Sequence, residues 1–152
     1  MFSIGEQNIT ARDYHNILFS SETVGIHETA LQQIANSFRF LETFHRDKII
    51  YGINTGLGPM AQYRIDESDR ISLHYNAIRS HASGAGEPVN PVYVRSAMIT
   101  MISGYSRGLS GIHPEVPALI RDMLNCGIVP YVPEHGGVGA SGDLVQMAHI
   151  AL

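Results

Sequence analysis

Apolar residues recur at three- and four-residue steps between positions 26 and 44, which is the spacing of one face of an α-helix. The residues in this stripe are Ile26, Ala30, Leu31, Ile34, Phe38, Leu41 and Phe44. Ser21 and Thr23 are candidate caps for its start, because a side-chain oxygen there can accept a backbone N–H of the first turn. Such a stripe is buried against other elements, so a helical fold is expected.

Glycine and proline divide much of the remaining chain into further helices. Three are predicted, over residues 68–83, 91–107 and 114–125, and the glycines expected to end them are Gly84, Gly108 and Gly127. Asn90-Pro91 is a start signal for the second of these, since proline is tolerated at the first helical position. A last helical pattern begins at Asp143, and the residues on its apolar face are Leu144, Met147, Ala148 and Ala151.

The stretch KIIYGINTGLGPMAQYRI, residues 48–65, interrupts this helical pattern. It holds three glycines and no helical stripe, so it is predicted to be a long ordered loop around Tyr51. Residues 1–25 are expected to hold a short strand or edge segment. The fold class is therefore mainly α-helical, with few or no long strands.

The last helical pattern carries no stop signal, because neither glycine, proline nor a basic last turn follows it. We therefore expect residues 1–152 to be a single N-terminal domain portion that is truncated within a helix. Charged residues make up 16% of the chain, against about 25% in an average soluble domain. This shortage favours a surface that partner chains, or the rest of a larger protein, cover.

Charge and cysteine content exclude several function classes. The chain carries a net charge of −4 and a single lysine, Lys48, and its arginines form no basic stripe, so nucleic-acid binding is not expected. Cys126 is the only cysteine, which points to a reducing compartment. The start of the chain lacks the pattern of a signal peptide, and the apolar runs fall far below the roughly 20 residues that cross a bilayer. A cytoplasmic protein without membrane contact is predicted.

The stretch GGVGASGDL, residues 136–144, has four glycines in seven residues directly before the last helix. Three interpretations fit such a stretch: a tight turn that needs positive φ, an anion site at the start of a helix, or a backbone cyclisation. In the third, the amide nitrogen of Gly142 attacks the carbonyl of Ala140, and Ser141 loses its hydroxyl. The loss of two waters leaves an imidazolone with an exocyclic methylene, which is an electrophile.

Three motifs together resemble the aromatic amino acid ammonia-lyases, the family of histidine, phenylalanine and tyrosine lyases. They are GGVGASGDL, YGINTGLG at residues 51–58 and IRSHASGAGEP at residues 78–88. The likeness runs from about Lys48 to the end of the chain. It implies the N-terminal, cofactor-bearing part of the fumarase/aspartase-like helical fold. Two residues depart from the family pattern: Gln146 stands where proline is usual, and Met147 where leucine is usual. Both lie outside the cyclising tripeptide.

The resemblance implies that Ala140, Ser141 and Gly142 form a 4-methylidene-imidazol-5-one without an external cofactor. This electrophile captures the amine of an amino acid, and a base removes the β-proton. Ammonia and a trans-acrylate result. Tyr51 matches the catalytic tyrosine of the family and is the candidate base. From its neighbours Ile49 and Ile50 alone, Tyr51 would be interpreted as a core aromatic.

Four further residues match substrate-binding positions of the family or are candidates beside them. Gly58 would let the loop lie close over the substrate, and Asn54 is a candidate for a backbone or carboxylate contact or for a turn-capping role. Ser80 and His81 match the pair that contacts the substrate ring. A histidine here favours histidine or tyrosine over phenylalanine, because an apolar ring offers it no hydrogen bond. The alternative for His81 is a helix-end histidine that bonds to backbone carbonyls.

The remaining histidines show no metal-ligand spacing such as H-E-x-x-H, so no metal is expected. They are treated as structural or exposed, and His135 is the one with a possible supporting role beside the glycine-rich stretch. Members of the family form homotetramers and place further site residues, including an arginine for the substrate carboxylate, beyond the region matched here. The chain alone is therefore predicted to be inactive. An aminomutase with the same prosthetic group, and a non-catalytic helical interaction module, are the alternatives.

Overall fold

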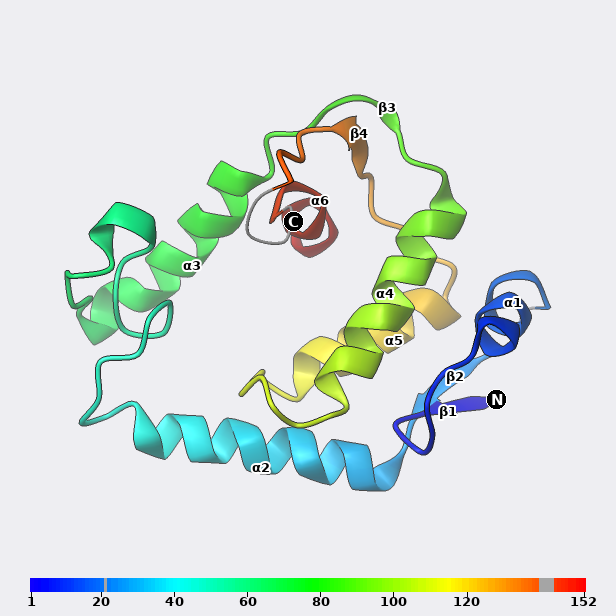
Figure 1. Cartoon of the computed structure of the whole chain (residues 1–152), viewed down its shortest axis with the longest axis horizontal. Coiled ribbons are helices and arrows are strands. Elements are labelled where there is room, and N and C mark those ends of the chain that lie inside the picture. The colour runs from blue at the N-terminus through cyan, green and yellow to red at the C-terminus, as the bar shows by residue number, and fades with distance from the viewer. Residues whose placement is uncertain (21, 140–143) are drawn as a thin grey trace. The chain divides into compact units, whose positions relative to one another are not determined.

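The computed structural model describes residues 1–20, 22–139 and 144–152 (Figure 1). They form two compact units. The first unit contains Met1–Glu42 and Asn90–Val129, and the second contains Thr43–Val89 and Pro130–Leu152. Helices dominate both units, which confirms the predicted mainly α-helical fold class.

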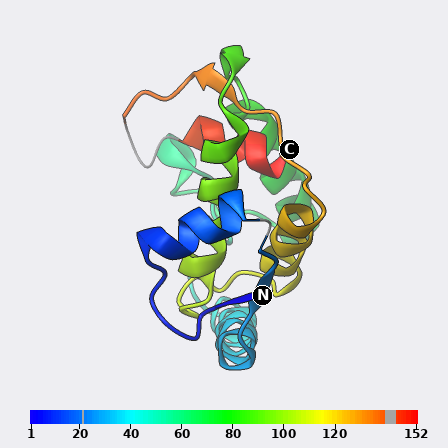
Figure 2. The same ribbon diagram turned by 90° about the vertical axis from the view of Figure 1, so that its right-hand side faces the viewer.

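The first unit combines a small sheet with helices. Its elements in chain order are β1 (Phe2–Ile4), α1 (Ala11–Phe19), β2 (Val24–Ile26), α2 (Glu28–Phe44, whose last two residues fall in the second unit), α4 (Pro91–Tyr105) and α5 (Glu115–Asn125). Strands β1 and β2 pair in parallel, with Phe2 opposite Val24 and Ile4 opposite Ile26. Helix α4 packs against α5 and α1 (Figures 1 and 2).

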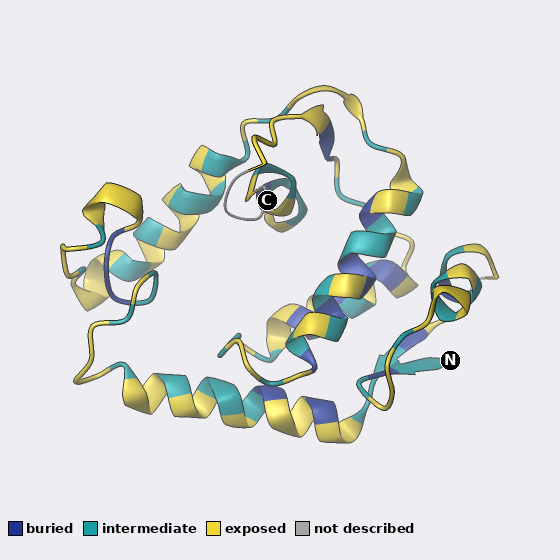
Figure 3. Ribbon diagram, viewed as in Figure 1, coloured by how far each residue is buried: buried dark blue, intermediate teal, exposed yellow. Residues whose placement is uncertain are grey.

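The apolar core of the first unit gathers along α4, where the ribbon is coloured as buried in Figure 3. Its fully buried large side chains are Ile4, Ile17, Ile34, Met98, Ile99 and Ile102. Each such side chain contributes about 1.5–3 kcal/mol when it leaves water. Every strand and helix of this unit contributes to the core, β2 through Val24 and α5 through the fully buried Pro117. Ile120 and Leu124 add the buried face of α5.

The ends of α4 and α5 follow the sequence signals closely. The side chain of Asn90 accepts the N–H of Val92 at 2.9 Å, so it caps α4 as predicted. At the end of α5, Gly127 has φ +70°. Its N–H bonds to Leu124 O, and the N–H of Ile128 bonds to Met123 O at 2.8 Å. This pair of bonds is a Schellman motif, in which glycine takes the left-handed conformation that other residues avoid.

The start of α2 differs from the prediction. Ile26 belongs to β2, and the helix begins at Glu28. Thr23 is too far away to cap it and instead pairs with β1, since its carbonyl accepts the N–H of Phe2 at 2.8 Å. His27 takes the place of a cap, because its Nδ1 accepts the N–H of Thr29 at 3.3 Å. Ser21, the other candidate, lies outside the described residues.

Helix α1 lies within residues 1–25, where only a strand or edge segment was expected. Its start is a capping box: the N–H of Asp13 bonds to Thr10 Oγ1, and the Asp13 carboxylate accepts the N–H of Thr10 at 2.8 Å. A threonine followed by an acidic residue three positions on is the sequence signal that could have predicted this helix.

The second unit contains the loop, two helices and a small sheet. Its elements in chain order are η1 (Gly58–Met60), α3 (Glu67–His81), β3 (Ala85–Pro88), β4 (Pro133–His135) and α6 (Leu144–Ala151). Strands β3 and β4 are antiparallel, with Ala85 opposite His135 and Pro88 opposite Pro133. Helix α6 packs against α3. The long ordered loop around Tyr51 is confirmed, and it holds only the short helix η1.

The predicted helix ends shift by small amounts. Helices α3 and α4 end at His81 and Tyr105, two residues before the predicted ends. On the apolar face expected for α6, Ala148 is buried, whereas Leu144 and Met147 remain partly exposed. The start of this pattern at Asp143 lies outside the described residues. Across the described residues, every helix is too short or too polar to cross a membrane.

Candidate active site

The described candidate residues all belong to the second unit. Tyr51, Asn54 and Gly58 lie in the loop between α2 and α3, and Ser80 and His81 are the last two residues of α3. Ala140, Ser141 and Gly142 lie outside the described residues, and the structure gives only what flanks them. The Tyr51 loop and the Ser80–His81 pair thus lie in the same compact unit.

Asn54 is the centre of the loop and is only 3% exposed. Its Nδ2 donates to the carbonyls of His45 and Lys48 at 3.0 and 2.7 Å. Its Oδ1 accepts the N–H of Ile50 at 2.8 Å. Both donors of the amide and its oxygen are thus engaged with the backbone of the loop. In the described structure, the Asn54 side chain therefore bonds to the backbone of its own loop.

Thr55 supports the same loop and was not singled out in the sequence. It is 1% exposed. Its Oγ1 accepts the N–H of Gly52 at 3.2 Å and donates to Gly56 O at 2.9 Å. A Cβ on Gly56 would lie 2.6 Å from Met60 O, so only glycine fits there. The signal that could have found Thr55 is its position between Asn54 and Gly56, where small polar residues bond to nearby backbone.

Tyr51 is 62% exposed, which is not the environment of a core aromatic. Its Oη accepts the N–H of Gly58 at 3.1 Å. Gly58 has φ +54° at the start of η1, a conformation that favours glycine. The loop therefore presents the phenol ring outward and holds its oxygen with one backbone donor.

Ser80 and His81 share one acceptor at the end of α3. The Ser80 hydroxyl donates to Ala77 O at 3.1 Å, and His81 Nδ1 lies 2.7 Å from the same oxygen. Because a carbonyl oxygen only accepts, the imidazole carries its hydrogen on Nδ1. In the neutral ring, Nε2 is then an acceptor. His81 therefore does bond to a backbone carbonyl, and the other side of its ring stays available as an acceptor.

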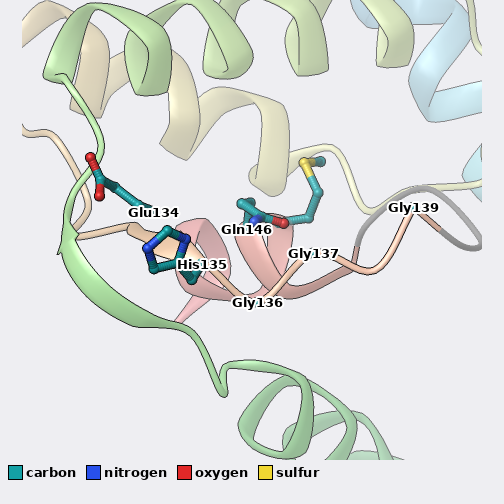
Figure 4. Close-up of a pocket in the computed structure, with 7 residues that line it drawn as sticks. Glu134, His135, Gly136, Gly137, Gly139 and Gln146 are labelled. Atoms are coloured by element: carbon teal, nitrogen blue, oxygen red, sulfur yellow. The ribbon is translucent and has the colours of Figure 1, made fainter.

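The segments on either side of residues 140–143 line an open pocket of about 600 Å³ (Figure 4). Its lining residues are Glu134, His135, Gly136, Gly137, Gly139, Gln146 and Met147. Gly136 and Gly139 have φ +139° and +67°, so the backbone before the tripeptide turns in ways that favour glycine. These residues fit a prosthetic group built from a tight backbone turn beside a cavity.

Helix α6 carries two polar residues near this site, Gln146 and His149. Gln146 Oε1 is buried without a hydrogen-bond partner in the part of the chain that the structure describes. His149 Nε2 accepts the N–H of Gly84 at 3.0 Å. From the sequence, His149 is expected to be structural or exposed, and this bond gives it a structural role. Its partner lies 65 positions away, so no local pattern could have indicated the contact.

The second unit thus combines an outward tyrosine, a histidine with a defined tautomer and a glycine-rich turn. Residues 9–152 match the model of one protein family, aromatic amino acid lyase. This chain belongs to the aromatic amino acid lyase family. The match covers the three motifs and extends the likeness towards the N-terminus, to α1 and all of the first unit from residue 9 onward.

Individual relatives agree with this family. The chain is 35% identical to a histidine ammonia-lyase of Halalkalibacterium halodurans over 96% of its own length and 29% of the relative. Among solved structures, it is similar to the phenylalanine aminomutase of Pantoea agglomerans, with a TM-score of 0.92, 29% identity, and coverage of 100% of this chain and 29% of that one. A histidine ammonia-lyase from Trypanosoma cruzi has a TM-score of 0.87 at 29% identity, with coverage of 99% and 29%.

These relatives are much longer than the chain. It spans 29% of the histidine ammonia-lyases from Halalkalibacterium halodurans and Treponema denticola. The chain thus belongs to the aromatic amino acid lyase family, and what it does within a whole protein is a matter for proposal.

Proposed function

We propose that this chain, as part of a longer protein, is an ammonia-lyase that acts on histidine or tyrosine and releases urocanate or coumarate. The observation that carries the proposal is the exposed Tyr51 oxygen, held by the N–H of Gly58 in the same unit as His81. The family match and the histidine ammonia-lyase relatives support it.

The prosthetic group of the proposal is the methylidene-imidazolone of Ala140, Ser141 and Gly142, which supplies an electrophile for the substrate amine. Tyr51, as the general base, takes the β-proton onto its oxygen. The electrons of that C–H bond form the new double bond, and the bond between Cα and nitrogen breaks, so that ammonia leaves. A positioned base of this kind contributes about 10²- to 10⁴-fold to the rate.

Tyr51 needs a neighbour that tolerates negative charge on its oxygen when it acts as a base. The N–H of Gly58 is such a neighbour, because it points at Oη from 3.1 Å. Asn54 and Thr55 hold the loop that connects the two residues. The proposed role of Gly58 is therefore to orient the base and to let the loop lie close to the substrate, and that of Asn54 is to keep this loop folded.

His81 is proposed to contact the substrate ring together with Ser80. Its Nε2 accepts hydrogen bonds once Nδ1 donates to Ala77 O. The imidazole N–H of histidine and the phenol O–H of tyrosine can both donate to it. A phenyl ring cannot, and would leave this nitrogen unsatisfied at a cost of about 1–3 kcal/mol. This favours the two polar substrates over phenylalanine.

Two measurements on the full-length protein that contains this chain test the proposal. Its intact mass should be lower by two waters than the sequence mass, and Ser141→Ala should restore the uncyclised mass. Histidine and tyrosine should then be offered separately, with absorbance used to follow the acrylate. An uncyclised mass together with no acrylate from either amino acid would contradict the proposal and favour a non-catalytic helical module.

A second candidate is an aminomutase, which returns the amine to the β-carbon. The likeness to the phenylalanine aminomutase of Pantoea agglomerans favours keeping it. Chromatography of the products distinguishes the two, because a mutase yields a β-amino acid. For the whole protein we further expect a homotetramer in the cytoplasm, with no nucleic acid or membrane as partner.

A further inference from the structure

His149 connects two parts of the second unit that lie far apart in the sequence. It is on α6, and its Nε2 accepts the N–H of Gly84, which lies just before β3, at 3.0 Å. Gly84 comes three residues after His81, and α6 begins directly after Asp143. One hydrogen bond therefore joins the helix that follows the glycine-rich stretch to the segment that follows the Ser80–His81 pair.

The backbone around this bond is packed too closely for a side chain. A Cβ on Gly84 would lie 2.9 Å from His149 Nε2 and 3.1 Å from both His135 O and Pro133 Cγ. A Cβ on Gly136 would lie 2.6 Å from Val145 Cγ1 and 3.1 Å from Gly84 Cα. The link before β3, the end of β4 and the start of α6 thus meet at van der Waals distance.

The link between His81 and Gly84 is itself held by hydrogen bonds. The N–H of Ala82 donates to Ile78 O at 2.9 Å, and that of Ser83 donates to His81 O at 2.8 Å. A shift of Gly84 would therefore be passed on to the end of α3. Since α3 also packs against α6, His149 holds the end of α3 from the side on which α6 lies.

We infer that His149 is a positioning residue, which sets the place of the Ser80–His81 pair relative to α6 through its bond to Gly84. The inference rests on the proposed function, because it assigns a purpose to that pair. It gives His149 no contact with substrate. The required feature of the side chain is one acceptor atom at the distance of Nε2 from the helix backbone.

Two amide variants separate this requirement from general packing. In His149→Gln, the side-chain oxygen can reach the place of Nε2, whereas in His149→Asn it is one carbon too short. Both side chains end in a carboxamide, so they differ chiefly in length. His74→Asn is the matched control, because His74 is an exposed histidine on α3 in the same unit.

The experiment uses the full-length protein and three readouts. Intact mass gives the degree of cyclisation, steady-state kinetics with histidine and tyrosine give KM and kcat, and hydrogen exchange gives the protection of the Gly84 amide. For His149→Asn we expect KM to rise about fivefold or more, the worth of one hydrogen bond, with faster exchange at Gly84. His149→Gln and His74→Asn should stay within about twofold of the unsubstituted protein.

Several outcomes would overturn the inference. One is equal KM for His149→Asn and His149→Gln, and another is unchanged protection of Gly84 in His149→Asn. If His149→Asn does not fold, the folded His149→Gln variant decides instead. Faster hydrogen exchange at Gly84 in that variant would contradict the inference. Failure of the proposed function looks different, because the unsubstituted protein would then release no ammonia. The exchange comparison at Gly84 would still decide whether His149 holds this segment.

Discussion

At the scale of single residues, two side chains of the loop around Tyr51 differ in burial and in hydrogen bonding. Asn54 is buried and bonds three times to the backbone, whereas Tyr51 is exposed and makes one bond through its oxygen. Asn54 therefore stabilises the loop, whereas the loop depends much less on Tyr51 for its stability. Substitutions at the two positions should therefore separate stability from catalysis.

Replacement of Asn54 by alanine should lower the stability of the second unit by about 3 kcal/mol. The change leaves the N–H of Ile50 and the carbonyl of Lys48 without the side-chain amide that binds them, and a part-buried polar group that loses its partner costs about 1–3 kcal/mol. The urea midpoint of unfolding measures this loss. Asn36→Ala on the exposed side of α2 is the control and should change stability by about 0.5 kcal/mol or less.

Replacement of Tyr51 by phenylalanine should lower kcat of the full-length enzyme by about 10²- to 10⁴-fold, the range of a lost general base. The cyclised mass should persist, because Tyr51 takes no part in forming the ring. Tyr75→Phe, at an exposed tyrosine of α3, should leave kcat unchanged. An active Tyr51→Phe enzyme would remove Tyr51 from the proposed chemistry.

At the scale of elements, capping residues and glycines at the helix ends determine where each helix begins and ends. The capping box of α1 and the glycines after α4 and α5 are the clearest cases. Each of these helix ends leads to a prediction below.

The pH dependence of α1 should follow Asp13. Hydrogen bonds from Thr10 hold the pKa of the Asp13 carboxyl below its usual value. A lowered pKa in the folded state stabilises the fold above the unfolded value, near 3.9, and this gain is lost as pH falls through the folded pKa. Helicity should therefore decline on acidification below about pH 4. Circular dichroism of Thr10→Ala should show a smaller decline, since the variant lacks the side-chain bond.

Gly108→Ala should cost more stability than Gly127→Ala. Both glycines have positive φ, +64° and +70°, so alanine strains either by about 1–2 kcal/mol. At Gly108 a Cβ would also lie 2.7–2.9 Å from Cβ, O and C of Gln33. At Gly127 no heavy atom of the described chain lies within 4 Å of that Cβ. Urea unfolding of the two variants measures the loss in the free energy of unfolding for each. Equal losses would mean that α2 moves away from the new Cβ without loss of stability.

At the scale of the whole molecule, the described residues leave large apolar side chains exposed in both units. Examples are Phe19, Leu109 and Leu119 in the first unit and Ile71 in the second. Charged residues are few, at 16%. The chain spans 29% of relatives such as the Halalkalibacterium halodurans enzyme, and in a longer protein such side chains are candidates for contact with other segments.

The 152-residue chain alone is therefore expected to self-associate and to release no ammonia from histidine or tyrosine. Under the proposed function, other parts of a longer protein would cover these exposed apolar side chains and complete the site. Light scattering measures the association, and an ammonia assay beside the full-length protein measures activity. Turnover by the short chain would show that the residues described here suffice.

The sequence by itself determined the helices and the candidate residues, because periodic apolar residues, Asn90-Pro91 and the glycines after α4 and α5 act over a few positions. It missed α1, whose capping box is short, and it began α2 too early, because Ile26 suits a strand as well as a helix. Resemblance to a family, carried by three motifs, named Tyr51, Ser80 and His81.

Only the tertiary structure decided which of these segments meet. The bond from Gly84 to His149 and the pairing of β3 with β4 depend on positions that the folded chain brings together. A local pattern records how a segment prefers to fold, since that preference is set by near neighbours along the chain. Contact between distant segments is set by how their surfaces fit, and that fit exists only once both have folded.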